Sequence, residues 1–188
     1  MLDLGAIGKG YAIEKSVEIL RETGVTSALV HGGTSTVYAI GQPVDQDAWK
    51  VALTLPETLG GSEHAVRASL ARAATEEARR PLAVVNLADE SLSVSAVWGK
   101  SFTIEGKTYG HILDPRTGAP VDGPLMAAVV LPSATETDAL STALLALGSS
   151  GHERLARERP SWRSMLVEKT SAGLSITTRG LTSLMERS

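Results

Sequence analysis

The sequence predicts an α+β fold in which a largely antiparallel sheet is flanked by helices. Predicted strands outnumber predicted helices, and most neighbouring strands are joined by tight turns rather than by long crossover segments. The 188 residues suit a single domain, and 43% of them are hydrophobic while 21% are charged. A chain of this size and composition can bury a core of its own.

Each predicted element rests on a local pattern. Strands are predicted where apolar and polar residues alternate, or where a short apolar run lies between turn residues. Helices are predicted where apolar residues recur every three or four positions, with Gly24 and Gly148 as C-terminal caps. Ser133 and Glu136 form a capping box before the helix at 138–147. In chain order, the prediction is a helix at 7–23, strands at 27–31, 36–40, 49–55, 82–87, 91–97, 102–104, 109–113 and 126–131, helices at 138–147 and 152–158, and strands at 165–168 and 174–177.

One segment does not fit this pattern. Residues 57–81 are rich in alanine and arginine and contain few large apolar side chains. Because both residue types favour helices but the apolar stripe is thin, the segment is interpreted as a helical insertion on the surface.

Composition excludes several classes of protein. Eighteen basic against twenty-one acidic residues give a net charge of −3, which argues against nucleic-acid binding. The absence of cysteine excludes disulfides, thiolate metal sites and cysteine nucleophiles. No apolar run approaches the roughly 20 residues of a transmembrane segment, and no signal peptide is visible. His64 and His152 lie in polar helical stretches and are expected to be solvent-exposed.

The first of three candidate clusters lies where the first helix begins. Asp3 is followed by Gly5, Gly8, Lys9 and Gly10. Glycines let a backbone approach a ligand closely, N–H groups at a helix start favour anions, and Lys9 adds a positive charge. The spacing matches neither a P-loop nor a dinucleotide-binding fingerprint. An aspartate N-cap followed by flexible glycines would explain the same residues without a ligand.

The second cluster is the HILDPRTG segment at 111–118. Asp114, Pro115 and Gly118 are typical turn residues. A histidine at the end of a strand just before such a turn, as His111 is expected to be, can serve as a general base. A surface histidine beside an ordinary turn is the alternative.

The third cluster is Asp138 with Thr142, four residues apart on one face of a predicted helix. One carboxylate and one hydroxyl are too few for a protein-only cation cage. They do suit Mg²⁺, which keeps waters and shares its coordination shell with substrate phosphates. In the alternative, Asp138 only complements the helix dipole, worth about 0.3–1 kcal/mol, and Thr142 bonds back to the carbonyl four residues earlier.

Together the clusters resemble the ApbE family, the FAD:protein FMN transferases. DLGAIGKGYAIE at 3–14 is similar to the family's DLGGIAKGYAVD segment, and LVHGGTSTVYAIG is similar to its glycine-turn hairpin. GHILDPRTGAPV is similar to its HIIDPRTG-P segment, and ATETDALSTALLALG to its DALSTA-LG helix. The four matches follow the family order from residue 3 to about residue 148.

The resemblance implies an enzyme that cleaves FAD at its pyrophosphate, moves FMN onto a Ser or Thr hydroxyl of an acceptor protein and releases AMP. Mg²⁺ is required in this family. Carried over by motif position, the metal ligands would be the Ala6 carbonyl and the side chains of Asp138 and Thr142. The implied acceptor is a flavoprotein, such as a subunit of a redox complex. Family members are often periplasmic or membrane-anchored lipoproteins, and a cytoplasmic location is also open, so the chain leaves its compartment undetermined.

The resemblance also implies contacts to FAD. Asp3, Lys9 and the backbone around Ile112 would contact FAD, and His111 would be the base that accepts the proton of the incoming hydroxyl.

The chain departs from the family pattern in three ways. Family members are longer, so residues 1–188 are interpreted as one flavin transferase domain that lacks the family's N-terminal region. Thr34 stands where the family commonly has an aspartate after the glycine pair. Residues 93–99 keep only part of a Ser-Gly-containing segment, and Ser95 is assigned no role. Two other functions stay open: a non-catalytic half-domain that binds FAD or a nucleotide, and a pyrophosphatase that hydrolyses FAD to FMN and AMP.

Overall fold

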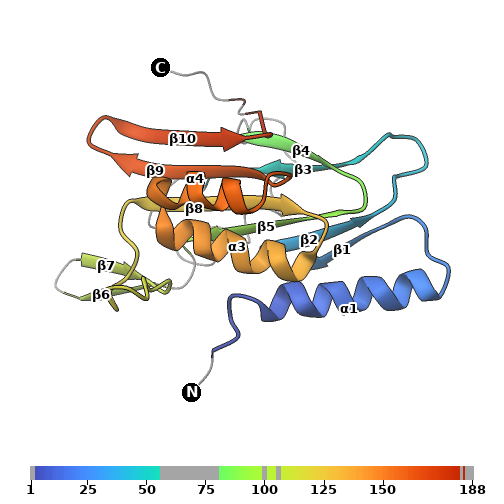
Figure 1. Cartoon of the computed structure of the whole chain (residues 1–188), viewed down its shortest axis with the longest axis horizontal. Coiled ribbons are helices and arrows are strands. Elements are labelled where there is room, and N and C mark those ends of the chain that lie inside the picture. Colours follow the sequence, from blue (N-terminus) through green and yellow to red (C-terminus); the bar gives the residue numbers. More distant parts are fainter. Residues whose placement is uncertain (1–2, 56–80, 99–100, 105–106, 183, 185–188) are drawn as a thin grey trace.

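A six-stranded antiparallel sheet forms the centre of the computed structural model, which describes residues 3–55, 81–98, 101–104, 107–182 and 184 (Figure 1). Its strands are β1 (Ala28–Gly32), β2 (Thr36–Ile40), β5 (Glu90–Ala96), β8 (Pro124–Leu131), β9 (Arg163–Thr170) and β10 (Gly173–Arg179). They lie side by side in the order β1-β2-β5-β8-β9-β10. Every neighbouring pair is antiparallel, which confirms the predicted fold class.

Smaller elements complete the fold. Two antiparallel pairs lie outside the central sheet: β3 (Trp49–Leu53) with β4 (Ala83–Leu87), and β6 (Ser101–Ile104) with β7 (Lys107–Gly110). The helices of the described residues are α1 (Gly8–Glu22), α3 (Ala134–Leu147) and α4 (Ser149–Glu158). None of them is long and apolar enough to cross a membrane. The predicted insertion at 57–81 lies almost wholly outside the described residues.

Strand β8 runs through the middle of the core, and both of its faces are buried. Met126, Ala128 and Val130 pack on the side of β3 and β4. The alternate residues Ala127 and Val129 pack under α3 and α4. Because successive side chains of a strand point to opposite faces, a strand between two layers needs the continuous apolar run MAAVVL.

Helix α1 covers the β1–β2 end of the sheet. Ile13 and Val17 are buried against Tyr38 and Ile40 of β2. The helix ends at Glu22, and Gly24 follows with a φ of +85°, a left-handed conformation that glycine adopts without strain. The prediction of a helix closed by this glycine is confirmed.

The strand expected at 109–113 is wrong in its bounds. β7 ends at Gly110, so His111 lies one residue beyond the strand. The chain then folds back on itself, because Val121 N–H donates to the Ile112 carbonyl and Asp114 N–H to the Ala119 carbonyl. These local hydrogen bonds replace those of a longer β ladder.

The expected exposure of His152 is also wrong. Its side chain is only 6% exposed, and its Nε2 lies 2.9 Å from the Ser164 hydroxyl. The ring lies against Trp162, with centroids 5.6 Å apart. Burial, together with the charge of Arg179, lowers the pKa of His152. His152 sits on the same helical face as Leu155 and was missed because polar neighbours surround it in the sequence.

Candidate functional site

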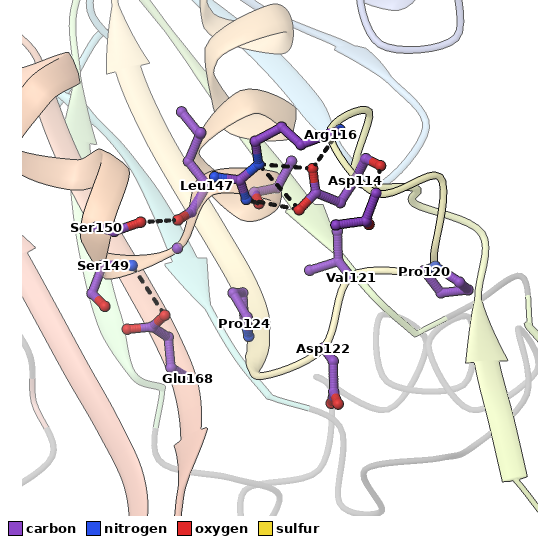
Figure 2. Close-up of a pocket in the computed structure, with 13 residues that line it drawn as sticks. Asp114, Arg116, Pro120, Val121, Asp122, Pro124, Leu147, Ser149, Ser150 and Glu168 are labelled. Atoms are coloured by element: carbon purple, nitrogen blue, oxygen red, sulfur yellow. Dashed lines mark hydrogen bonds and ion pairs between the residues drawn. The ribbon is translucent and has the colours of Figure 1, made fainter.

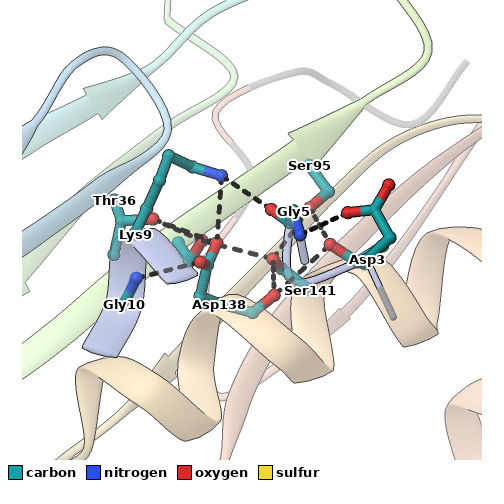
Figure 3. A network of polar contacts seen from close by, with 10 residues as sticks. Asp3, Gly5, Lys9, Gly10, Thr36, Ser95, Asp138 and Ser141 are labelled. Atoms are coloured by element: carbon teal, nitrogen blue, oxygen red, sulfur yellow. Dashed lines mark hydrogen bonds and ion pairs between the residues drawn. The ribbon is translucent and has the colours of Figure 1, made fainter. Parts of the chain in front are cut away.

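The carboxylate of Asp138 lies where α1, β2, β5 and α3 meet (Figure 3). Its side chain is 2% exposed. Oδ2 accepts a 2.9 Å hydrogen bond from Gly10 N–H, and Oδ1 accepts 3.3 Å hydrogen bonds from the hydroxyls of Thr36 and Ser93. Lys9 Nζ lies 3.7 Å from Oδ1. A buried carboxylate is stable only when it is paired and hydrogen-bonded, and both conditions are met here.

This environment corrects the view of Asp138 as a simple helix-dipole partner. A carboxylate at a solvated helix start contributes only about 0.3–1 kcal/mol. Removing the buried Asp138 side chain would instead leave Gly10 N–H without its acceptor, which costs roughly 1–3 kcal/mol. The Asp138 carboxylate therefore holds α1 to α3.

Gly10 is required by packing. A Cβ atom at this position would overlap the Ala134 carbonyl oxygen and lie 2.7 Å from Asp138 Cβ. The sequence left open whether this glycine serves a ligand or only a flexible helix start, and in the structure it brings α1 against α3. Gly8 has no atom within 4 Å of an added Cβ.

A row of hydroxyl groups continues from Asp138 along β5 and α3. Ser141 Oγ donates to Ser93 Oγ at 3.2 Å. Ser95 Oγ lies 2.9 Å from both Ser141 Oγ and Thr142 Oγ1. The two residues of the third cluster, Asp138 and Thr142, are therefore connected through intervening hydroxyls.

The first cluster forms an exposed turn beside this row. Asp3 Oδ1 accepts a 2.7 Å hydrogen bond from Gly5 N–H, and the Gly5 carbonyl accepts one from Lys9 Nζ at 3.3 Å. Asp3 therefore closes its own turn and is not the N-cap of α1, a position that Ile7 occupies without a side-chain bond. Ala6 is exposed within this turn. Through Lys9, the turn that carries Asp3 and Ala6 contacts the buried carboxylate.

Glu14 fixes α1 on the start of α3. Its carboxylate accepts hydrogen bonds from the Ser133 hydroxyl at 2.9 Å and from Thr135 N–H at 2.8 Å. Burial alone would raise the pKa of Glu14, but these hydrogen bonds outweigh it and the pKa is lowered. Ser133 also caps α3 by accepting from Glu136 N–H, as the capping box predicted.

The second cluster is an exposed loop built from local contacts (Figure 2). Arg116 pairs with the Asp114 carboxylate through Nε at 2.9 Å and Nη2 at 2.7 Å, and these hydrogen bonds lower the pKa of Asp114. Arg116 Nη2 also donates to the Ala146 carbonyl at 3.2 Å, one helical turn beyond Thr142. A cleft of about 370 Å³ separates this loop from the start of α4.

His111 and Ile112 differ in exposure. His111 is exposed, whereas Ile112 is half-buried and packs against the core cluster that includes Leu144 and Leu145 of α3. The Ile112 carbonyl is held by Val121 N–H. Ile112 therefore anchors the loop on the helix that carries Asp138 and Thr142.

The donor set fits a hard cation. In the part of the chain that the structure describes, no group of three His, Cys, Asp or Glu side chains could hold a metal ion. The groups gathered here are one carboxylate and several hydroxyls, and Mg²⁺ takes oxygen ligands while keeping part of its water shell. Oδ2 of Asp138 accepts one hydrogen bond among the described residues, and a carboxylate oxygen can accept two. Asp138 and Thr142 therefore offer oxygen donors of the kind that Mg²⁺ binds.

Sequence reasoning missed the hydroxyl residues that surround Asp138. Thr36, Ser93 and Ser141 are fully buried, and Ser95 is half-buried. Two signals were present: serines at every second position of 91–95, which share one face of a strand, and Ser141 three residues after Asp138.

The ApbE family model matches residues 1–166, a span that contains all three clusters. The chain belongs to the ApbE family. It is 30% identical over 175 residues to a FAD:protein FMN transferase of Treponema pallidum. The matched region covers 88% of this chain and 43% of that protein. It is 27% identical over 169 residues to one of Klebsiella pneumoniae, covering 89% of this chain and 43% of that protein.

Solved structures agree with this assignment. The Pseudomonas stutzeri flavinyl transferase ApbE superposes with a TM-score of 0.70 at 27% identity, over 95% of this chain and 49% of that one. The ApbE protein of Thermotoga maritima shares the fold, with a TM-score of 0.74 at 23% identity over 95% of this chain and 51% of that one. The chain thus spans about half the length, or slightly less, of the relatives it matches.

Proposed function

We propose that this chain carries out the Mg²⁺-dependent transfer of FMN from FAD to a Ser or Thr hydroxyl of an acceptor protein, with release of AMP. The observation that carries the proposal is the buried Asp138 carboxylate, connected to Thr142 and contacted by Lys9 from a glycine-rich turn. This arrangement supports a site for phosphate groups together with a cation. The family relationship supports FAD as the source of those phosphates.

The proposed cation ligands are the Ala6 carbonyl and the side chains of Asp138 and Thr142. When bound, Mg²⁺ would offset the charge that develops on the phosphates during transfer. Lys9 Nζ lies 3.7 Å from Asp138 Oδ1, and the Lys9 side chain is 44% exposed. Its ammonium can therefore reach a phosphate oxygen while it stays close to the carboxylate.

The remaining proposed roles concern FAD and the proton. Asp3, on the exposed turn, and the backbone around Ile112 would contact FAD. His111, exposed beside the Asp114 turn, would accept the proton of the incoming hydroxyl. A hydroxyl is a weak nucleophile at neutral pH, and an imidazole is a common general base for such a proton transfer.

The proposed reaction is a displacement at phosphorus. The acceptor oxygen forms a bond to the phosphorus of the FMN half, and the bond from that phosphorus to the bridging oxygen breaks. AMP leaves with the bonding electron pair, and the hydroxyl proton goes to His111. Positioning and charge stabilisation supply most of the catalysis in such transfers.

One observation favours a second candidate. Because the chain covers only 43% of its curated relatives, the pocket for FAD could require residues outside this chain. The chain would then be a non-catalytic half-domain that binds FAD or a nucleotide. Hydrolysis of FAD to FMN and AMP would use the same residues with water in place of the acceptor hydroxyl.

One experiment separates these functions. The purified chain is incubated with FAD and Mg²⁺, with and without a threonine-containing acceptor protein, and AMP and covalent flavin are measured together. Transfer gives equal amounts of AMP and covalent flavin, and only with the acceptor. AMP with free FMN would indicate a pyrophosphatase, and bound FAD without AMP would indicate the half-domain. The isosteric Asp138→Asn variant is the matched control and should give neither product.

A further inference from the structure

The hydroxyl row between Thr142 and Asp138 has a defined direction. It contains four contacts: Thr142 with Ser95 at 2.9 Å, Ser95 with Ser141 at 2.9 Å, Ser141 with Ser93 at 3.2 Å, and Ser93 with Asp138 Oδ1 at 3.3 Å. Each of the four hydroxyls carries a single proton, and an ionised carboxylate can only accept.

If each of the four contacts is a hydrogen bond, these two facts give one order of donors. Ser93 donates to Asp138 and its own oxygen accepts from Ser141, while Thr36 Oγ1, 3.0 Å from Ser93 Oγ, donates to Ser93 or to Asp138. Ser141 shares its proton between Ser93 Oγ at 3.2 Å and the Asp138 carbonyl at 3.0 Å, so Ser95 donates to Ser141 and Thr142 donates to Ser95. Only this order gives each of the four contacts a proton, and every hydroxyl group in the row points toward the buried carboxylate.

The consequence for Thr142 is that its proton points inward and its lone pairs point away from Ser95. A neutral hydroxyl ligates a cation through a lone pair, so this orientation is the one that a metal site needs. Without Ser95, the remaining acceptor for the Thr142 proton among the described residues is the Asp138 carbonyl at 3.4 Å, which is at the limit of a hydrogen bond.

We propose that Ser95 is a positioning residue for the cation site, because it accepts the Thr142 proton and so orients the Thr142 hydroxyl toward the metal. The inference rests on the proposed function, which makes Thr142 a ligand. Groups that orient metal ligands in this way typically change metal affinity by about 10–100-fold when they are removed.

The test compares two serines of β5. Ser95→Ala removes the proposed acceptor, and Ser91→Ala is the matched control. Ser91 is buried on the same strand, but its hydroxyl donates to the Val37 carbonyl at 2.9 Å and is not part of the row. A third variant, Ser95→Thr, keeps a hydroxyl at position 95.

Mn²⁺ is the probe. Its affinity for each variant of the 188-residue chain is measured by electron paramagnetic resonance in the presence of ADP, with protein-free ADP as the blank. Ser95→Ala should lose about tenfold or more in Mn²⁺ affinity, whereas Ser91→Ala and Ser95→Thr should stay within about threefold of the wild type. Melting temperatures are measured in parallel. A purely structural role would lower the melting temperature of both alanine variants without separating their Mn²⁺ affinities.

The outcomes distinguish this inference from the proposed function. Equal Mn²⁺ affinity of Ser95→Ala and the wild type would overturn the role of Ser95 and leave the proposed function standing. An equal loss in Ser91→Ala would also overturn it. If the wild-type chain binds no Mn²⁺ with ADP, both the metal site of the proposed function and the role of Ser95 are wrong.

Discussion

The two halves of the candidate site are built in opposite ways. The Asp138 cluster gathers side chains from α1, β2, β5 and α3, and its carboxylate is 2% exposed. The loop after His111 is exposed, and Asp114 and Arg116, its paired charges, are two residues apart. One region depends on contacts across more than a hundred residues of sequence, and the other depends mainly on its own turn.

This difference decides how each region responds to change. In the buried cluster every polar group has a partner inside the protein, so a substitution leaves a desolvated group behind and affects folding as well as chemistry. In the exposed loop, water replaces a lost partner at little cost. Substitutions around Asp138 should therefore change stability and activity together. Substitutions around His111 should change activity with little effect on stability.

The largest effect is expected for Asp138→Ala. The variant should lose more than about 100-fold in FMN transfer, since removing a ligand costs more than the 10–100-fold typical of a group that orients one. It should also lose roughly 1–3 kcal/mol of unfolding free energy, because Gly10 N–H loses its acceptor. The amount of covalent flavin measures FMN transfer, and urea denaturation measures the free energy of unfolding. Asp138→Asn keeps an acceptor and should regain stability without activity. Wild-type transfer by either variant would remove Asp138 from the site.

The second effect tests the loop. His111→Ala should lower FMN transfer by about 100-fold, within the range typical of a general base, while FAD affinity and the melting temperature stay close to wild type. Covalent flavin and fluorescence titration of FAD measure the two separately. His31→Ala, at an exposed histidine of β1 outside the loop, is the control. A parallel loss of FAD binding would make His111 a wall of the pocket, and unchanged transfer would exclude it as a base.

The third effect tests packing in the cluster. Gly10→Ala should lower the unfolding free energy by about 1–3 kcal/mol, because its methyl group overlaps the Ala134 carbonyl and forces α1 away from α3. Gly8→Ala, two residues earlier in the same helix, has open space around its Cβ and should be neutral or stabilising. Thermal unfolding of both variants measures the difference. If both variants melt alike, the close approach at Gly10 is not a constraint.

The smallest effect is expected for Arg116→Ala. Its hydrogen bonds to Asp114 are exposed, so the melting temperature at neutral pH should change by about 2 °C or less. The pKa of Asp114 should rise toward its ordinary value. Because this pKa is lowered in the folded protein, its stabilising effect is present at neutral pH and is lost as the pH falls through the acidic range. Titration of the Asp114 carboxyl by NMR measures the shift, and an unchanged pKa would contradict the pairing.

The sequence predicted the loop more completely than it predicted the cluster. Asp114, Pro115 and Gly118 identify a turn through local preferences, and the structure confirms the turn. The predicted strand before it, 109–113, continues past Gly110, where β7 ends. The local hydrogen bonds of Ile112 and Asp114 compete with a β ladder, and periodicity does not reveal this competition. For the cluster, the sequence identified Asp138 and Thr142 but did not predict that Gly10 packs against α3.

The sequence by itself determined the fold class, the order of the strands along the chain, the helix boundaries near Gly24 and Gly148, and the three motifs that carry the family resemblance. These features follow from periodicity, capping and turn chemistry, which act over a few neighbouring residues. Only the tertiary structure decided which residues meet Asp138. Thr36, Ser93, Ser95 and Ser141 are ordinary polar residues in their own segments, and the pairing of β2 with β5 and the packing of α3 on β5 bring them together. A buried carboxylate needs several donors at once, and no single segment of this chain can supply them.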